Sequence, residues 1–304
     1  MKKIAGCLFI VILLMLCGCE KTGEELLKQD GYTLEEVNID IAEVTRPYKL
    51  VFVNDLHMQI NNDEIASDEK DFMSARVKEF SYDGSSTYEK WQTLPDSLEK
   101  LNADLYVFGG DILDFCSKEN MSELEKGLGR LNKPVLYVRS DHDVEPYWLE
   151  SMSATECMVR QSEIAKFDDI ITFDFGEFIV LGINLSQNNI SDDALARIKE
   201  VFSDNRPIVI VTHIPIDQKD EDELAFFSES VRDGRRLYWG YGAEKEPNSN
   251  TREFIDMIYA DDTPVKAVLG AHIHASWEGN ITENVIEHIF GPCFMKNIGI
   301  VSIY

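Results

Sequence analysis

Positive charge is scarce in this sequence. The 304 residues include 29 lysines and arginines against 55 aspartates and glutamates, which gives a formal net charge of −26 at pH 7. A protein surface of this charge repels phosphate backbones at long range. A general nucleic-acid-binding role is therefore disfavoured, and nucleic acid is an unlikely partner.

Long hydrophobic runs are also missing. The longest one extends from Ile4 to Leu16 and has 13 residues, whereas a transmembrane helix needs about 20. Because Lys2 and Lys3 precede it, this run indicates a secretory signal rather than a membrane span. It ends in Leu16-Cys17-Gly18-Cys19, which resembles the lipobox of bacterial lipoproteins.

The lipobox resemblance implies cleavage before Cys19 and lipid on its sulfur, so that the protein is anchored to the cell membrane on its extracytoplasmic side. A plain signal peptide that is cut elsewhere is the alternative. We therefore expect three parts: a lipoprotein signal peptide at 1–18, a lipid-anchored acidic tether at 19–46, and one domain at 47–304. Alternating apolar residues predict an edge strand at Glu36–Ile41, within the tether.

Cysteine is the third scarce feature. After removal of residues 1–18, only Cys116, Cys157 and Cys293 remain besides the predicted anchor. An odd number excludes a complete disulfide framework but allows one bridge. None of the three has the spacing of a thiolate metal site with a second cysteine.

Short apolar runs that alternate with segments of helical periodicity make up most of the chain. Five runs have the length of buried strands: Leu50–Val53, Leu105–Phe108, Val135–Val138, Ile208–Val211 and Val265–Leu269. The predicted helices are Tyr88–Leu101, Met121–Leu131, Asp192–Phe202, Asp222–Arg232 and Asn250–Tyr259. Further strands are expected at Ile170–Phe173, Phe178–Asn184, Val285–Phe290 and Ile298–Ile303. This alternation is typical of an α/β layered sheet.

Aspartate and histidine follow each of the five strand-like runs. The segments are Asn54-Asp55-Leu56-His57, Gly109-Gly110-Asp111-Ile112-Leu113-Asp114, Arg139-Ser140-Asp141-His142-Asp143, Thr212-His213 and Gly270-Ala271-His272-Ile273-His274. Open α/β sheets bind ligands outside the carboxyl ends of their strands, so these segments are expected to converge. Five of the six histidines lie in them, which favours one shared site.

The spacing within these segments suits metal binding. Extended backbone places residues i and i+2 on one side, so Asp55 with His57, and His272 with His274, are each expected to present two ligands. The Asp111 carboxylate can bridge two cations, and the Gly109-Gly110 pair lets the backbone approach them closely. Imidazole and carboxylate ligands favour Mn, Fe, Zn or Co.

These motifs, over roughly residues 48–280, resemble the calcineurin-like metallophosphoesterase family, whose pattern is D-x-H, G-D-x-x-D, G-N-H-[DE], a lone His and G-H-x-H. The resemblance implies a four-layer α-β-β-α sandwich with a dinuclear metal site at the carboxyl ends of the strands. It implies that one metal is held by Asp55, His57, Asp111 and His274, and the second by Asp111, Asp141, His213 and His272. It also implies two catalytic residues: His142 beside the substrate phosphate, and Asp114, which orients it.

The sequence departs from the family pattern at two places. Asp141 stands where the family usually has asparagine, and the added negative charge is expected to bind a cation more tightly and to make bound water less acidic. Ala271 is inserted between Gly270 and His272, which is a small change of the backbone.

The resemblance implies a metal-dependent hydrolase of phosphate mono- or diesters, in which a hydroxide that bridges two divalent or trivalent ions is the nucleophile. One alternative is a metal-binding lipoprotein with little or no catalytic activity, which only Asp141 favours. A nuclease is another, and the net charge disfavours it. Two long stretches, Met58–Ser86 and Asp233–Ser249, are expected to be either rims of a substrate cleft or plain surface loops.

Overall fold

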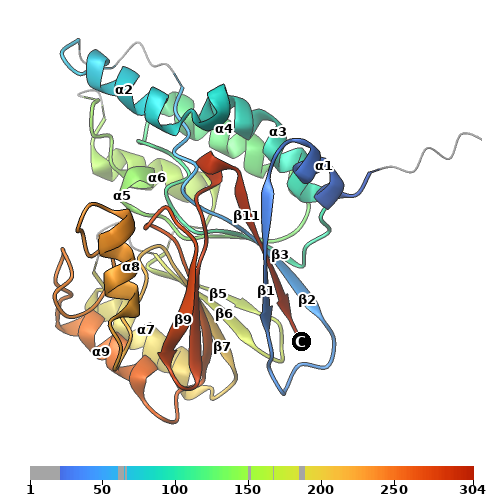
Figure 1. Cartoon of the computed structure of the whole chain (residues 1–304), viewed down its shortest axis with the longest axis vertical. Helices are drawn as coiled ribbons and strands as arrows, with labels where there is room; N and C mark the ends of the chain where they lie inside the picture. Colours follow the sequence, from blue (N-terminus) through green and yellow to red (C-terminus); the bar gives the residue numbers. More distant parts are fainter. Residues whose placement is uncertain (1–20, 61–64, 66, 150–151, 167, 185–188) are drawn as a thin grey trace, which may run out of the picture.

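The computed structural model describes residues 21–60, 65, 67–149, 152–166, 168–184 and 189–304. These residues form two mixed β-sheets with helices on both outer sides (Figure 1). The predicted signal peptide and Cys19 lie outside the described residues. None of the helices in the described part of the chain has the length and apolar character of a membrane span.

The first sheet has the strand order β1-β11-β2-β3-β4. Its strands are β1 (Thr33–Ile39), β11 (Asn297–Ile303), β2 (Tyr48–Val53), β3 (Leu105–Phe108) and β4 (Val135–Tyr137). Strands β2, β3 and β4 are parallel, so their carboxyl ends lie at one edge of the sheet. Strand β11 runs antiparallel to β2 and parallel to β1.

The second sheet has the order β5-β6-β7-β8-β10-β9. Its strands are β5 (Ile170–Asp174), β6 (Ile179–Ile183), β7 (Ile208–Thr212), β8 (Val265–Gly270), β10 (Val285–Ile289) and β9 (Trp277–Thr282). The four inner strands are parallel, and the two edge strands are antiparallel to their neighbours. All five predicted core strands are therefore confirmed, with bounds that differ by at most two residues.

Helices complete the four layers. The first sheet is covered by α1 (Gly23–Gln29), α3 (Thr87–Glu99) and α4 (Lys118–Leu128), with α6 (Ala154–Ile164) packed against α4. The second is covered by α7 (Asp192–Ser203) and α9 (Ser249–Tyr259), on the opposite side of the molecule (Figure 1). Three helices lie outside these layers: α2 (Lys70–Phe80), α5 (Asp141–Val144) and α8 (Glu223–Val231). The predicted four-layer sandwich is confirmed.

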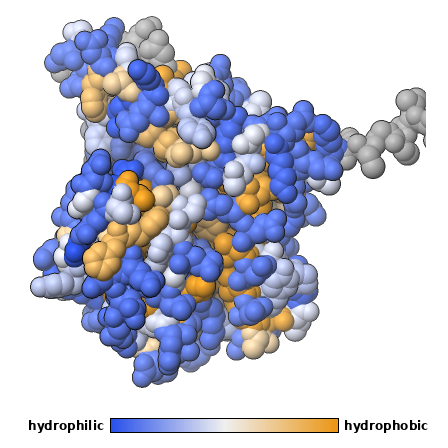
Figure 2. Space-filling model, viewed as in Figure 1, coloured by the Kyte–Doolittle hydropathy of each residue, from blue (hydrophilic) through white to orange (hydrophobic). Residues whose placement is uncertain are grey.

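A core between the two sheets explains the unbroken apolar runs. Phe52, Val107, Val180, Val211 and Leu269 are fully buried in it. The alternate residues of the same strands are buried under the helices, so both faces of each strand avoid water. The outer surface, in contrast, is largely hydrophilic in the view of Figure 2. Cys116, Cys157 and Cys293 are buried and unbridged, so the disulfide that the sequence allowed is not formed.

Much of the segment expected to be a tether is folded onto the domain. Helix α1 packs against α3, and β1 pairs with β11 along its whole length. The predicted edge strand is present with shifted bounds, whereas α1 was not expected. Its sequence signal is a capping box, in which the side chains of Thr22 and Glu25 each accept a hydrogen bond from the backbone N–H of the other.

Glu287 on β10 anchors the chain just after His213. Its Oε1 atom accepts a hydrogen bond from the N–H of Ile216 at 2.9 Å, while its buried Oε2 atom has no hydrogen-bond partner in the described part of the chain. Burial raises the pKa of Glu287 well above its usual value. The folded chain therefore holds a proton that the unfolded chain releases above a pKa of about 4.3.

We expect Glu287→Gln to stabilise the protein at neutral pH. Because the folded-state pKa is raised, the wild type loses stability as pH rises above the unfolded-state pKa. Glutamine keeps the acceptor and does not ionise, so the Tm of the variant should be higher by roughly 2–4 °C at pH 7, with the difference shrinking toward pH 4. Thermal unfolding between pH 4 and pH 8 measures this, with the exposed Glu283→Gln as the control. A gain that is the same at pH 4 and pH 7 would contradict the assignment.

Candidate metal centre

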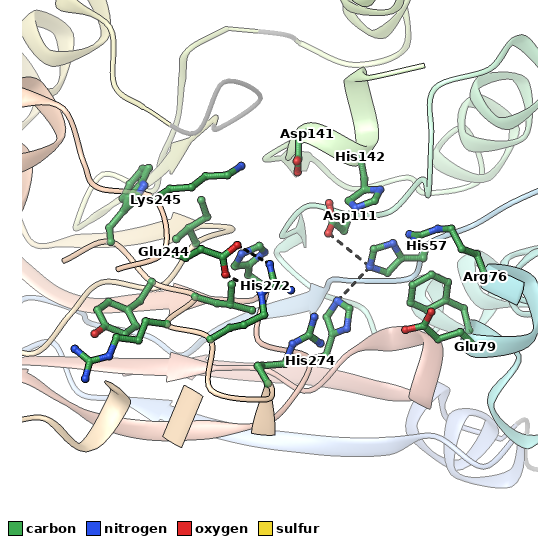
Figure 3. Close-up of a pocket in the computed structure, with 18 residues that line it drawn as sticks. His57, Arg76, Glu79, Asp111, Asp141, His142, Glu244, Lys245, His272 and His274 are labelled. Atoms are coloured by element: carbon green, nitrogen blue, oxygen red, sulfur yellow. Dashed lines mark hydrogen bonds and ion pairs between the residues drawn. The ribbon is translucent and has the colours of Figure 1, made fainter. Parts of the chain in front are cut away.

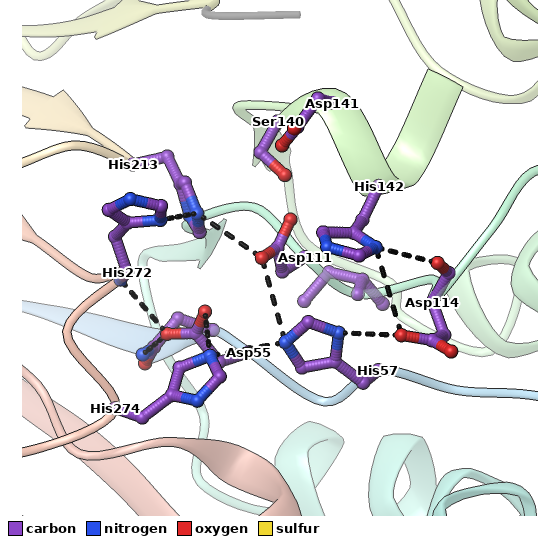
Figure 4. A network of polar contacts seen from close by, with 12 residues as sticks. Asp55, His57, Asp111, Asp114, Ser140, Asp141, His142, His213, His272 and His274 are labelled. Carbon is purple, nitrogen blue, oxygen red and sulfur yellow. Dashed lines mark hydrogen bonds and ion pairs between the residues drawn. The ribbon is translucent and has the colours of Figure 1, made fainter. Parts of the chain in front are cut away.

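The aspartates and histidines that follow the core strands meet in one buried cluster (Figure 4). Asp55 and His57 follow β2, Asp111 follows β3, His213 follows β7, and His272 and His274 follow β8. The predicted convergence at the carboxyl ends of the strands is thereby confirmed for these six residues.

The six residues form two groups that share Asp111. Asp55, His57, Asp111 and His274 offer ligand atoms that all lie within 4.8 Å of one another, and so do Asp111, His213 and His272. The Asp111 Oδ2 atom lies 3.5 Å from His57 Nε2 and 3.4 Å from His213 Nε2. Asp111 is therefore common to both groups, and it is the residue for which the resemblance implies a bridging carboxylate.

The donor atoms of the cluster fit cations. The buried Oδ1 atoms of Asp55 and Asp111 have no hydrogen-bond partner in the described part of the chain. The Nε2 atoms of His57 and His274 face each other at 3.2 Å, and His213 Nε2 faces His272 Nδ1 at 3.1 Å. Burying such groups is costly unless they are paired, and a cation between them satisfies carboxylates and imidazole lone pairs together. The residues present therefore suit two transition-metal ions.

Two imidazole rings of the cluster are oriented by acceptors outside it. The Nδ1 atom of His213 donates to the carbonyl oxygen of Gly109 at 2.9 Å. The Nδ1 atom of His57 lies 3.0 Å from Oδ1 of Asp114. Each contact turns Nε2 toward the cluster and leaves its lone pair for a metal ion.

The backbone at the ligands is left-handed rather than extended. The φ angles are +44° at Asp55, +49° at His57, +52° at Asp111, +71° at His272 and +56° at His274. The sequence predicted extended backbone for two pairs, Asp55 with His57 and His272 with His274. That prediction is wrong, although both members of each pair reach the cluster. Residues other than glycine adopt this region only when their surroundings hold them there. Here the N–H of Asp55 donates to Gly110 O and that of His57 to Asp111 O, both at 2.9 Å.

The predicted role of the Gly109-Gly110 pair is confirmed. A Cβ atom on Gly110, where φ is +95°, would lie 2.6 Å from Nδ1 of His213, and one on Gly109 would lie 2.4 Å from the Phe52 ring. Only glycine lets this segment pass so close to a ligand and to the core.

Asp141 lies beside the cluster rather than within either group of close ligand atoms. It lines the cleft, and its Oδ2 atom accepts a hydrogen bond from the hydroxyl of Tyr147 at 2.9 Å. Tyr147 itself has a φ of +42° and lies beside the His142 ring. No pattern in the sequence indicates this contact, because the loop after α5 has no regular periodicity.

His142 and Asp114 are neighbours, but their contact differs from the one expected. The Nδ1 atom of His142 donates to the backbone carbonyl oxygen of Asp114 at 2.7 Å, and the Asp114 carboxylate is 3.7 Å away. That carboxylate instead accepts hydrogen bonds from His57 and, through both oxygens, from Arg76 on α2. Although burial opposes ionisation, Arg76 and His57 hold the pKa of Asp114 below its usual value. Sequence reasoning missed Arg76, since only the packing of α2 brings it here.

Asp143 holds the backbone around the shared ligand. Its buried carboxylate accepts hydrogen bonds from the N–H groups of Asp111, Ile112, Leu113 and Ser140 at 2.9–3.0 Å, and from the Tyr137 hydroxyl at 2.6 Å. Only a carboxylate side chain can accept so many hydrogen bonds at once. Asp143 was noted in the sequence only as part of a motif, and its structural role was missed.

We expect Asp143→Asn to weaken both the fold and metal binding. The amide nitrogen cannot accept hydrogen bonds, so buried N–H groups near Asp111 lose their partner at a cost of about 3 kcal/mol. Denaturant unfolding and titration calorimetry with Mn or Zn measure the two effects. Asp104→Asn is the control, because Asp104 also accepts a backbone hydrogen bond, from Lys49, but lies far from the cluster. A variant with wild-type metal affinity would contradict this role.

A cleft of about 260 Å³ opens onto the cluster (Figure 3). The stretch Met58–Ser86 contributes Arg76, Glu79 and Phe80 to its lining. The stretch Asp233–Ser249 contributes Arg235, Arg236, Leu237, Tyr238, Trp239, Glu244 and Lys245. Of the two interpretations that the sequence left open, the cleft rim is therefore correct for both stretches.

Comparisons with known proteins were made for sequence and for structure. A family model described as calcineurin-like phosphoesterase matches residues 48–276. No match was found among curated proteins. A solved dimetal phosphatase from Danio rerio is 11% identical, with 82% of this chain and 88% of that chain covered and a TM-score of 0.47.

Two further solved structures are similar. A purple acid phosphatase from yellow lupin (Lupinus luteus) seeds is 12% identical, with 83% of this chain and 45% of that chain covered and a TM-score of 0.49. A phosphopantetheinyl hydrolase from Mycobacterium tuberculosis is 13% identical, with 82% and 91% covered and a TM-score of 0.42. Because the family model spans more than half of the chain and includes every strand end that supplies the cluster, the protein belongs to the calcineurin-like phosphoesterase family.

Proposed function

We propose that this phosphoesterase hydrolyses phosphate mono- or diesters outside the cytoplasmic membrane, to which lipidated Cys19 anchors it. The observation that carries the hydrolytic part is the sharing of Asp111 between two groups of buried ligands. The lipobox-like Leu16-Cys17-Gly18-Cys19 sequence supports the location.

Seven residues would hold the metal ions in this proposal. Asp55, His57, Asp111 and His274 bind one ion, and Asp111, His213 and His272 bind the second, with Asp141 as a further ligand of the second. Two cations at this place neutralise phosphoryl charge and lower the pKa of water. The Tyr147 hydroxyl donates to the Oδ2 atom of Asp141, and Oδ1, which has no such hydrogen bond, would be the oxygen offered to the ion.

His142 is the proposed proton donor. Its Nδ1–H is engaged by the carbonyl oxygen of Asp114, so Nε2 is the atom that is left to face the substrate. The ring lies on the cleft wall, with its side chain 23% exposed. In the proposed reaction the ring starts with a proton on both nitrogens, and its Nε2 proton passes to the leaving oxygen as the bond from that oxygen to phosphorus breaks. Asp114 contributes by fixing the tautomer through its carbonyl group and by holding His57 through its carboxylate.

A second candidate function is metal binding with little or no catalysis. The observation that favours it is the carboxylate of Asp141 at the position where the family pattern has asparagine. The added charge strengthens cation binding and makes bound water less acidic, which would slow attack on phosphorus near neutral pH.

Hydrolysis and metal binding without catalysis are separated by the turnover of the metal-loaded wild type and of the variant Asp111→Ala. We expect protein lacking residues 1–19, loaded with Mn, Fe, Zn or Co, to hydrolyse aryl phosphate mono- or diesters. The Asp111 variant should lose turnover and both ions, because both ligand groups need this carboxylate. Metal analysis and product release are the measurements, with the fully exposed Asp261→Ala as the control. Stoichiometric metal in the wild type without turnover of any ester would favour the second candidate.

His142→Ala tests the proton donor. We expect the variant to keep its metal ions and to lose about 10²–10⁴-fold in kcat, the usual contribution of general acid catalysis. Kinetics together with metal content measure this. His288→Gln is the matched control, since His288 pairs with Glu278 on the neighbouring strand and lies outside the cleft. Unchanged turnover in His142→Ala would remove this residue from the mechanism.

A further inference from the structure

One wall of the cleft is cationic, although the chain as a whole is strongly acidic. The residue after α8 and the loop that follows supply Arg232, Arg235, Arg236 and Lys245 to the lining. With a formal net charge of −26, the rest of the molecule repels anions at long range. A local group of cations beside the metal centre offsets this repulsion at the place where an anion has to enter.

Two of the four cations are already neutralised. Arg235 donates two hydrogen bonds to the Glu244 carboxylate, at 2.7 and 2.9 Å. Arg236 pairs with Glu229 at 2.6 Å. Arg232 and Lys245, in contrast, have no carboxylate partner among the residues that the structure describes. The wall therefore keeps two positive charges that are available to a ligand.

Arg232 lies in surroundings that favour an anionic ligand. It is only half-exposed, and burial lowers the pKa of its guanidinium below the usual value. A partly buried cation without a close counterion is costly, and a bound anion removes that cost. Arg232 lines the same cleft as Asp111 and His274, and the carboxylates of Asp55, Glu79 and Asp233 attract its charge.

Lys245 is placed farther along the cleft. Figure 3 shows its side chain on the side of the cleft opposite Arg76 and Glu79, with the ammonium group directed into the open space near Asp141. If the phosphoryl group of an ester lies at the metal centre, this space remains for the rest of the ester. Arg232 and Lys245 both line the cleft that opens onto the cluster, so both border the space that remains for the rest of a bound ester.

We propose that Arg232 and Lys245 form a subsite for a second anionic group, a carboxylate or a further phosphate, on the leaving group of the ester. The proposal rests on the proposed phosphoesterase function and names its substrate class. Esters with a neutral leaving group lack a partner for these cations. The alternative is that both cations bind the phosphoryl group itself, and the test separates the two.

Two substrates of the same shape test the subsite. In 4-carboxyphenyl phosphate and 4-carbamoylphenyl phosphate the leaving groups differ by one charge. We expect wild-type kcat/KM to be about tenfold higher for the carboxylate, the effect of one charge-assisted hydrogen bond, and the advantage to fall as salt is added. Arg232→Gln and Lys245→Met should each reduce this preference while metal content is unchanged.

Matched variants outside the cleft are the controls. Arg252→Gln removes an exposed arginine that pairs with Glu246, and Lys133→Met removes an exposed lysine of another surface. Neither should change the preference. A wild type without preference for the carboxylate overturns the proposal, and so do cleft variants that lose the same factor on both esters. The second result would assign the cations to the shared phosphoryl group.

A binding experiment keeps the subsite separate from the proposed function. The metal-loaded protein is titrated with 4-carboxyphenylphosphonate and 4-carbamoylphenylphosphonate, which cannot be hydrolysed in the same way. We expect the carboxylate to bind about tenfold more tightly, and Lys245→Met to reduce the difference. If neither ester is hydrolysed but the two phosphonates bind with different affinity, the proposed hydrolytic function is contradicted and the proposed subsite is supported. Equal dissociation constants for the two phosphonates in the wild type overturn the subsite.

Discussion

A single buried carboxylate, that of Asp143, holds the point where the two ligand groups join. It accepts hydrogen bonds from four backbone N–H groups, three in the turn at Asp111 and one at Ser140, just before α5. The turn needs this support because Asp111 has left-handed backbone, as do the other ligands at the ends of β2 and β8. The position of Asp111, shared by the two ligand groups, depends on these hydrogen bonds, and therefore so does the chemistry that we propose.

Buried charge explains the arrangement around the cluster. Three carboxylates, those of Asp55, Asp111 and Asp114, are buried within a short distance of one another. Asp114 is neutralised by Arg76 and His57, whereas Asp55 and Asp111 keep buried oxygens without hydrogen-bond donors in the described part of the chain. The imidazoles of His274, His57 and His213 lie 3.3–3.5 Å from these two carboxylates, and a cation at the same place would offset their charge further. Arg76 thus offsets the charge of Asp114, whereas the free oxygens of Asp55 and Asp111 remain suited to a cation.

The departure from the family pattern at Asp141 has a structural counterpart. Asparagine would offer one oxygen to a cation, and aspartate offers two. Tyr147, which has a left-handed backbone next to His142, donates its hydroxyl to one of these oxygens. The added negative charge is thus partly offset by a residue of the same loop. Arg232 and Lys245 line the same cleft and carry excess positive charge in a chain that is otherwise acidic, which concentrates attraction for anions at the site.

The sequence alone determined the layered fold and most of the ligands. Strands buried on both faces need unbroken apolar runs, and parallel strands end at one edge, so Asp55, Asp111, His213 and His272 were found from periodicity and position. Tertiary structure decided the rest. The left-handed backbone of the ligands, the folding of α1 onto α3, and the bond between Arg76 and an aspartate 38 residues away leave no periodic signal. Such contacts depend on how separate elements pack, whereas the local sequence indicates only which face of each element is buried.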